Sequence, residues 1–412
     1  MTTIPKICLN MIVKDESHII EERLTALYEK IKFDYYVISD TGSTDNTKEL
    51  MKSFFDSIEV NGEFYDHEWK DFGTNRSQAL ECAYNKSEYL LIFDADDIVI
   101  GNFQLPIFME YDKYNLKFGE ECLYYRPLLI NNQKKWCFKG VLHEYLEPVE
   151  FVPLEINLDG DYYIISGKTG HRNKDPEKYI KDAKILEKAF EETFNTDYKL
   201  ACRYSFYCAQ SFKDAEYIED AIKWYEKTIL LDGWNQEKYY SCIVLAEMYK
   251  NNNQFKAIEY MLKSIQFDNE RLEGVVMACE LCVNNNLHTF VNYLHEKYSN
   301  LGIPNNKLFL YRHLYNDYIH YYNSISCFYL NKYDEGYDSI KKIMKNNILD
   351  DVLMDQTIKN IFFYKDQINN DETMDAFNSL SMIVKKKKGE NKELAPQYKE
   401  LYNYLNEKHF TF

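Results

Sequence analysis

The chain has 412 residues, of which 45% are hydrophobic and 28% are charged, and its formal net charge is −17. This length exceeds one ordinary domain and predicts two, with enough apolar residues for substantial cores. The negative charge opposes a surface that tracks phosphates, which excludes nucleic acid as a partner, and no apolar stretch approaches the length of a membrane span.

Three apolar strands are predicted in the first hundred residues, at 7–13, 35–39 and 90–93. The first runs into the polar loop 14–17 and a helical pattern, and the second into the polar loop 40–47 and another helix. Strand, loop and helix repeating in this order predict a parallel sheet with right-handed crossovers. The three loops should therefore lie at the same edge of the sheet.

The third strand ends in an acidic turn, Asp94-Ala95-Asp96-Asp97. A strand buried on both faces has no use for charge along its length, so these acids are expected at the sheet's exposed carboxyl edge, where ligands bind in open α/β sheets. Carboxylates two residues apart can converge on a hard divalent cation such as Mg2+ or Mn2+. The alternative interpretation is a solvated turn after a core strand.

Four segments together resemble glycosyltransferase family 2, whose members are inverting enzymes of the GT-A fold. They are Lys14-Asp15-Glu16, Asp40-Thr41-Gly42-Ser43-Thr44-Asp45, the segment with Trp69, Phe72 and Arg76, and Asp94-Ala95-Asp96. The resemblance covers about residues 5–175. It implies an α/β GT-A domain, Rossmann-like with a mostly parallel sheet, that transfers a hexosyl group from a nucleotide sugar. A UDP-sugar such as UDP-glucose or UDP-GlcNAc is the expected donor.

The resemblance also implies which residues bind the donor. Asp40 would meet the base and ribose, and Arg76 would face the pyrimidine or the diphosphate, although an ordinary surface arginine is an equal alternative. The first loop would contribute Asn10, Lys14 and Glu16. Asp45 either contacts the nucleotide or only caps the next helix.

A metal site is implied at the acidic turn. In the family's Asp-x-Asp motif, Asp96 would ligate Mn2+ or Mg2+, with Asp94 touching the ribose or the metal, while Asp97 is expected only to cap the following turn. The cation would stabilise the departing diphosphate as a Lewis acid. His171, in a glycine-rich loop that could act as a lid, would be a third ligand, and imidazole favours Mn2+; an unremarkable surface histidine is the alternative.

An inverting transfer needs a base for the acceptor's proton, and Glu144 is predicted for this role. Related sugar transferases carry a His-Glu pair where this chain has His143 and Glu144. The alternatives are a structural pair supporting a β-hairpin, or a base at Asp159 or Asp161.

From residue 176 to 412 the strand signals vanish and helical periodicity dominates. Ala221 and Ala257 lie 36 residues apart in similar segments, close to the tetratricopeptide period of about 34 residues, and Gly336 marks a weaker third copy. We therefore predict a catalytic domain at 1–175 and an all-α tetratricopeptide-like solenoid at 176–412. The groove of this solenoid could bind a protein, peptide or glycan acceptor, or the helical region could mediate a homodimer. The lysine run at 385–388 is expected to be an exposed loop.

Other residue usage sets the expected compartment. The N-terminus lacks the apolar core of a signal peptide, which favours a soluble, cytoplasmic protein. Abundant Tyr, Asn and Lys suggest an AT-rich genome, that of a large virus or of a low-GC bacterium. If the source is viral, the expected compartment is the host cytoplasm. Cys279 and Cys282 form a lone CxxC pair, for which reduced, buried thiols are favoured over zinc.

Two other function classes compete with transfer. A decayed transferase domain could serve as a tetratricopeptide binding scaffold, but the retained carboxylates at Asp94 and Asp96 oppose this. A nucleotidyltransferase, a distant third, usually opens with a glycine-rich basic loop after the first strand, and the loop at 14–17 has no glycine.

Overall fold

In the computed structural model, the described residues are 5–106, 108–119, 124–167, 169–305, 307–315, 317–345, 351–367 and 403. The chain divides into two compact units, Met1–Glu237 and Lys238–Phe412. The first unit holds the described strands and the helices that follow them directly. The fold type changes near the predicted boundary at residue 175, but the first helices beyond it belong to the first unit. That boundary therefore stays a prediction.

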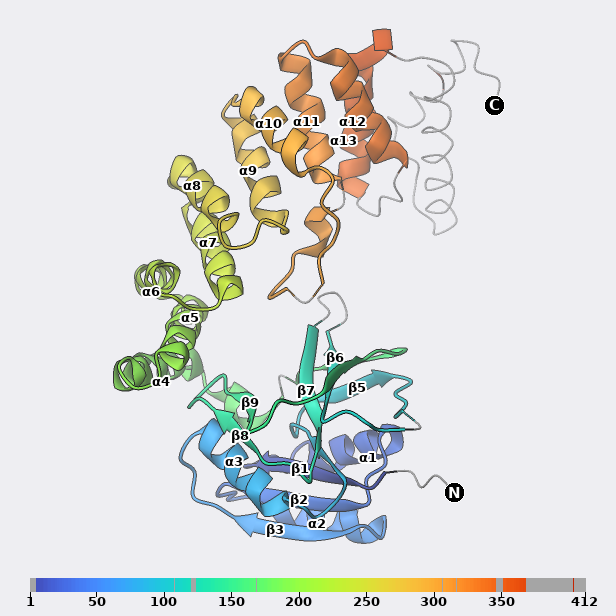
Figure 1. The fold of residues 1–412 in the computed structure, drawn as a ribbon, viewed down its shortest axis with the longest axis vertical. Coiled ribbons are helices and arrows are strands. Elements are labelled where there is room, and N and C mark those ends of the chain that lie inside the picture. Colours follow the sequence, from blue (N-terminus) through green and yellow to red (C-terminus); the bar gives the residue numbers. More distant parts are fainter. Residues whose placement is uncertain are drawn as a thin grey trace. The chain divides into compact units, whose positions relative to one another are not determined.

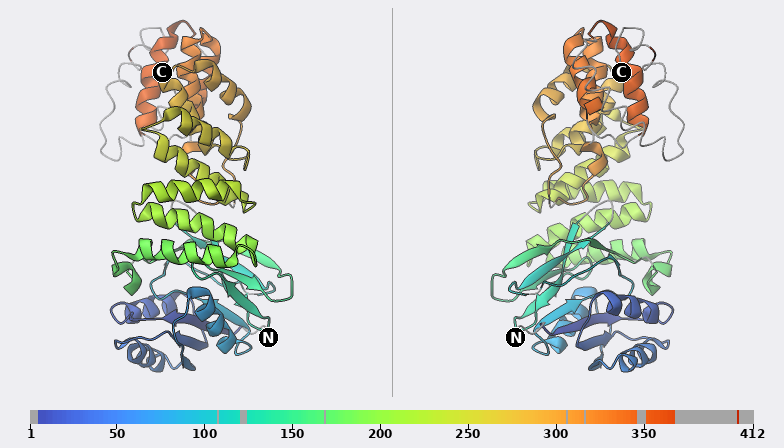
Figure 2. Two further views of the ribbon diagram at one scale, coloured as in Figure 1. Left: turned by 90° about the vertical axis from the view of Figure 1, so that its left-hand side faces the viewer. Right: turned by 90° about the vertical axis from the view of Figure 1, so that its right-hand side faces the viewer.

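The first unit alternates strands and helices, then continues in strands, and ends in helices (Figure 1). Its elements are β1 (Ile7–Val13), α1 (Ile20–Lys30), β2 (Tyr35–Asp40), α2 (Thr47–Ser57), β3 (Asn61–Asp66), α3 (Phe72–Ala83), β4 (Tyr89–Ile92), β5 (Ile98–Gly101), β6 (Lys113–Phe118), β7 (Tyr124–Asn131), β8 (Trp136–Lys139), β9 (Tyr145–Pro148), β10 (Glu155–Leu158), β11 (Tyr162–Ile165), η1 (His171–Lys174), α4 (Lys178–Thr193), α5 (Tyr198–Asp214) and α6 (Ile218–Leu230). The last three helices pack side by side in chain order and are drawn in green in Figure 2.

The main sheet has the order β3-β2-β1-β4-β7-β6-β11-β5, and β10 pairs with β6. The pairs β1–β2, β2–β3 and β1–β4 are parallel, whereas β7 runs antiparallel to both β4 and β6. This is the mostly parallel sheet that the sequence predicts. The partly exposed β3 was not predicted, because it lacks an apolar run.

The strand registers bring the three predicted loops to one edge. Val13 at the end of β1 pairs with Asp40 at the end of β2. β4 ends beside Asn10, and the amide of Phe93 donates to the carbonyl of Asn10 at 3.1 Å. The chain therefore leaves β4 into the acidic turn beside the carboxyl ends of β1 and β2.

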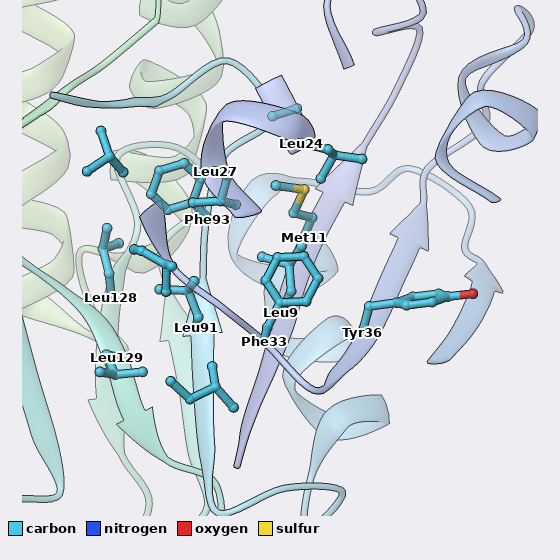
Figure 3. Close-up of a cluster of buried hydrophobic side chains, with 14 of the residues drawn as sticks. Leu9, Met11, Leu24, Leu27, Phe33, Tyr36, Leu91, Phe93, Leu128 and Leu129 are labelled. Carbon is cyan, nitrogen blue, oxygen red and sulfur yellow. The ribbon is translucent and has the colours of Figure 1, made fainter. Parts of the chain in front are cut away.

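Alternation along the strands separates two cores on opposite faces of the sheet. Leu9 and Met11 pack with Leu24 and Leu27 of α1, in the cluster drawn in Figure 3. Cys8, Val37 and Leu90, on the other face, pack with α3 and the small β8–β9 hairpin. Each fully buried leucine contributes roughly 1.5–3 kcal/mol to stability. The two cores hold the sheet from both faces and so fix the position of the edge where the polar loops lie.

The described secondary-structure elements of the second unit are all helices. After α7 (Asn235–Tyr249), which begins in the first unit, come α8 (Gln254–Ser264), α9 (Glu273–Asn284), α10 (His288–Tyr298), η2 (Arg312–Tyr315), α11 (Tyr318–Tyr329), α12 (Tyr333–Lys345), α13 (Asp351–Ile361) and η3 (Phe362–Gln367). Neighbours such as α8 and α9, or α11 and α12, pack in pairs. Among the described helices, none combines the length and apolar character needed to cross a bilayer.

The three predicted repeat segments fall in helices, namely α6, α8 and α12. A Cβ on Gly336 would collide with the Tyr364 hydroxyl, so the small residue permits a close approach of α12 and η3. Their assignment as tetratricopeptide repeats stays a prediction. Cys279 and Cys282 are buried thiols of α9, and burial raises the pKa of Cys282 to about 11. The lysine run at 385–388 lies outside the described residues.

Candidate active site

A cavity of about 790 Å³ opens at the carboxyl edge of β1, β2 and β4. The first loop, the start of α3, the acidic turn and the segment from Ser166 to Lys178 surround it. Its charged lining residues are Lys14, Glu16, Arg76, Asp94, Asp96, Asp97, Arg172, Lys174, Asp175 and Lys178. Cationic and acidic groups thus face one space, as a site for a charged ligand and its counter-ion requires.

Arg76 is the central group of this site. Its Nη2 donates to Asp94 Oδ1 at 2.6 Å, and its Nε donates to Glu144 Oε1 at 2.7 Å. Burial lowers the pKa of Arg76, but the two carboxylates outweigh that effect and the pKa lies above its ordinary value. Arg76 is therefore a buried, charged bridge between the acidic turn and the β8–β9 hairpin.

Local sequence explains why Arg76 reaches both partners. Asp71 caps α3 by accepting from the amide of Thr74 at 2.7 Å, which sets Arg76 in the first turns of the helix. A Cβ on Gly73 would collide with the carbonyl oxygen of Gly140. Only glycine therefore lets the start of α3 approach the loop 140–144 that carries Glu144.

The three acids of the turn have different environments. Asp94 lies between Arg76 and Arg126, whose Nη2 is 3.5 Å from Asp94 Oδ2; burial raises the pKa of Asp94, but the arginines outweigh it and the pKa is lowered. Asp97 is only 4% exposed, and burial, followed by the nearby charge of Asp94, raises its pKa to about 7. Asp96 lines the cavity, and its Oδ2 accepts from the amide of Gly170 at 3.2 Å.

Of the three acids in the turn, Asp94 and Asp96 differ in whether they can bind a cation. Both oxygens of Asp94 face arginines, so Asp94 does not fit as a metal ligand while those ion pairs hold. Asp96 does fit, because Mg2+ and similar ions are commonly held by one or two carboxylates, with substrate phosphates and water completing the shell. No three His, Cys, Asp or Glu side chains among the described residues form a cluster able to bind a metal.

His171 begins η1, directly after Gly170, whose amide contacts Asp96. The side chain of His171 lies outside the described part of the structure, so its role as a metal ligand stays a prediction. The structure explains why positions 167 and 170, which precede it, are glycines. A Cβ on Gly167 would collide with the carbonyl of Asp96, and one on Gly170 would lie 3.1 Å from Asp96 Oδ2.

Glu144 directly precedes β9, and its side chain is 13% exposed. The ring of the neighbouring His143 stacks on the ring of Tyr207, with centroids 4.0 Å apart. Burial, then the charge of Arg203, lowers the pKa of His143 to about 3. His143 is thus neutral near pH 7 and packed, and Glu144 is the member of the pair that faces Arg76.

Residues 8–116 match the family model described as Glycosyl transferase family 2. This match, which covers about a quarter of the chain, identifies these residues as part of a family 2 glycosyltransferase domain. No curated protein sequence matches the chain.

Two solved structures are similar to parts of the chain. A mannosyltransferase from Pyrobaculum calidifontis, in complex with GDP-Man and Mn2+, is 24% identical over 24% of this chain, with a TM-score of 0.21; the chain spans 29% of that protein's length. Residues 1–349 of TarS from S. aureus, in complex with UDP-GlcNAc, are 13% identical over 63% of this chain and 91% of theirs, with a TM-score of 0.32.

Lys14 and Glu16, two predicted donor residues of the family 2 domain, line the cavity, but Asn10 and Asp40 do not. Asn10 is buried within β1, and its amide donates to the carbonyls of Val37 and Ala79. Asp40 Oδ1 accepts from the amides of Gly42 and Ser43, at 2.8 and 2.7 Å, and closes the turn after β2. The structure thus gives Asn10 and Asp40 internal hydrogen-bonding roles.

Asp40 still borders a second, smaller cavity of about 460 Å³, together with Asp45, Asp66 and His67. Asp45 accepts from the amides of Thr47 and Ser17, so it joins the start of α2 to the first loop. Because Asn46 is the N-cap of α2, Asp45 lies one residue before the capping position, and its role as a helix cap or a nucleotide contact stays a prediction.

The other bases considered, Asp159 and Asp161, lie between β10 and β11. Like Glu144 they are absent from the described lining of the cavity, but Glu144 contacts Arg76, which does line it. Sequence reasoning assigned no role to Arg126, Arg172 or Lys178. Their signal was weak: Arg126 lies in a strand among aromatic residues, and the other two follow the glycine-rich loop without a recognisable motif.

Proposed function

We propose that the family 2 domain transfers a sugar, with inversion, from a UDP-sugar to a hydroxyl group of a glycan, peptide or protein. The bridge Asp94–Arg76–Glu144 carries this proposal: Asp94 and Arg76 line the 790 Å³ cavity, and Glu144 joins the site through its contact with Arg76. It joins the turn expected to face the donor to the carboxylate expected to face the acceptor. A transferase needs these two groups within one site.

The donor's diphosphate is assigned to the part of the cavity lined by Asp96, Lys14, Arg172 and Lys178. Asp96 would hold Mn2+ or Mg2+, with His171 as the proposed additional ligand. The bound cation would neutralise charge on the leaving diphosphate. The cationic side chains would orient the phosphates and add to the same neutralisation.

Glu144 is proposed as the general base. Arg76 binds one of its carboxylate oxygens and so fixes the orientation of the group. A carboxylate has a second oxygen, which can accept the proton of an acceptor hydroxyl within hydrogen-bond reach. The acceptor would approach past Trp69, whose side chain lines both this cavity and a neighbouring one of about 420 Å³.

The test is a panel of nucleotide sugars, each added to the full chain with and without Mn2+, with thermal unfolding as the readout. A donor that binds the native state at 100 times its Kd should stabilise it by about 2.7 kcal/mol. We expect stabilisation by a UDP-sugar that requires Mn2+, followed by metal-dependent release of UDP. If no nucleotide sugar stabilises the chain or is turned over, the proposed function is wrong and a binding scaffold is favoured.

A further inference from the structure

Three side chains of α5 hold the loop that carries Glu144. The hydroxyl of Tyr204 accepts from the amide of Val141 at 2.9 Å, and Nε of Arg203 donates to the carbonyl of His143 at 3.0 Å. Tyr207 contributes the ring that stacks on His143, at an interplanar angle of 11°. Positions 203 and 207 are one helical turn apart, so their side chains meet the loop together.

Arg203 is itself held from several sides. Its guanidinium lies over the rings of Tyr145 and Tyr207, at 5.3 and 4.7 Å from their centroids. Its Nη1 lies 3.3 Å from Oε1 of Glu237, in the first turn of α7, and Glu237 is only 3% exposed. An arginine fixed by stacking and by a buried carboxylate has little freedom to leave the His143 carbonyl.

The loop needs such a hold. His143 has a φ of +53°, in the left-handed region that a residue with a Cβ disfavours. A backbone of this kind persists only when its surroundings hold it there. The carbonyl of His143 and the amide of Glu144 belong to one planar peptide unit, so a hydrogen bond to this carbonyl also fixes where the Glu144 side chain begins.

We propose that Arg203 is a positioning residue for sugar transfer, which acts by holding the His143–Glu144 peptide so that Glu144 stays against Arg76. The inference rests on the proposed function, in which Glu144 is the base. It gives the helices after the catalytic sheet a direct part in the reaction. The connection runs from Asp94 through Arg76 and Glu144 to Arg203 and Glu237, entirely within the first unit.

The test is Arg203→Ala in the full chain, with kcat, donor KM and donor Kd measured against the wild type. Small misplacements of a reacting group cost up to about 100-fold in rate, so we expect kcat to fall by roughly 10- to 100-fold. Donor KM and Kd should stay within about twofold, because Arg203 does not line the described donor cavity. Lys199→Ala, at an exposed position of the same helix, is the matched control and should behave as wild type.

A double-mutant cycle separates positioning from a general structural effect. If Arg203 acts through Glu144, adding Arg203→Ala to Glu144→Gln should leave the residual rate unchanged. An equal loss in both backgrounds, or an unchanged kcat in the single variant, would overturn the inference. If Arg203→Ala does not fold, Tyr204→Phe is the second variant, because it removes only the hydroxyl that contacts Val141. We then expect a smaller fall in kcat, with donor KM and Kd unchanged and no added effect in the Glu144→Gln background.

The same measurements distinguish this inference from the proposed function. A wild-type chain that turns over no nucleotide sugar refutes the proposed function itself. Transfer that is lost in Glu144→Gln but complete in Arg203→Ala refutes only the positioning role. Full transfer by Glu144→Gln refutes both the base assignment and the inference built on it.

Discussion

Arg76 and Glu144 are 68 residues apart in the sequence, yet Nε of Arg76 lies 2.7 Å from Oε1 of Glu144. The other side of the same guanidinium contacts Asp94. Two carboxylates in one partly buried space would repel each other without this cation. The bridge therefore stabilises the fold and orients the group that is proposed to accept the proton.

Replacing Arg76 with alanine should damage both stability and transfer. Removing one partner of a buried ion pair typically costs about 3–5 kcal/mol, because the remaining charges are left uncompensated. We expect a loss of that order in denaturant unfolding, with transfer reduced by at least ~100-fold. Lys184→Ala removes an exposed ion pair with Glu187 and should cost less than about 1 kcal/mol. Equal stability losses in the two variants would contradict the role of the bridge.

Glu144→Gln tests the base directly. The substitution keeps the size of the side chain and an oxygen that can accept from Arg76, but it cannot take a proton. General bases contribute about 100- to 10,000-fold, so transfer should fall within that range while donor binding persists. Calorimetric binding of the donor, measured beside transfer, separates the two effects. If donor binding is lost together with transfer, Glu144 has a different role.

Asp96→Asn tests the cation. Asp96 is the acid of the turn that lines the cavity without an arginine partner in the described contacts, so it is the expected ligand. The variant should keep its fold and lose the effect of Mn2+ on both donor binding and turnover, to the level of the wild type in EDTA. Circular dichroism checks the fold. Metal-dependent turnover that survives in this variant would move the cation site elsewhere.

The fold could be predicted because its signals are local. The apolar runs at 7–13, 35–39 and 90–93 each end in polar residues, and the order of the elements fixes a common edge. The family resemblance then led to Arg76, Asp94 and Asp96, which the structure brings to one cavity.

The features that the sequence did not predict depend on contacts between distant segments or on which face of the sheet a strand residue occupies. Residues 7, 9 and 11 face α1 and α2, so Asn10 had to face α3, where its amide binds backbone carbonyls. The contact of Arg203 with the loop of the β8–β9 hairpin depends on how α5 packs, which no local pattern reveals. The sequence Asp-Thr-Gly-Ser at 40–43 did contain the signal of a side-chain-closed turn.

Gly167→Ala should disturb the donor side without touching a charged group. Its new Cβ would collide with the carbonyl of Asp96, so the loop 166–170 would have to move away from the acidic turn. Overpacking of this kind costs about 1–3 kcal/mol, and we expect donor binding to weaken with stability. Gly302→Ala is the control, because a Cβ there meets open space and the backbone is not left-handed. Unchanged donor binding in Gly167→Ala would show that the loop does not shape the donor site.

Asp97 should give the protein an unusual pH dependence. Burial raises its pKa from 3.8 to about 7, so the folded chain holds a proton on Asp97 at pH values where the unfolded chain has lost it. A carboxyl of this kind makes stability fall as pH rises from about 4 to about 7, with a slope of at most about 1.4 kcal/mol per pH unit. Asp97→Asn, compared with the wild type in EDTA by denaturant unfolding across this range, should remove that fall. If the unfolding free energy of the two proteins changes with pH by the same slope, Asp97 is ionised in the folded state across this pH range. Arg126 rather than a proton then neutralises it.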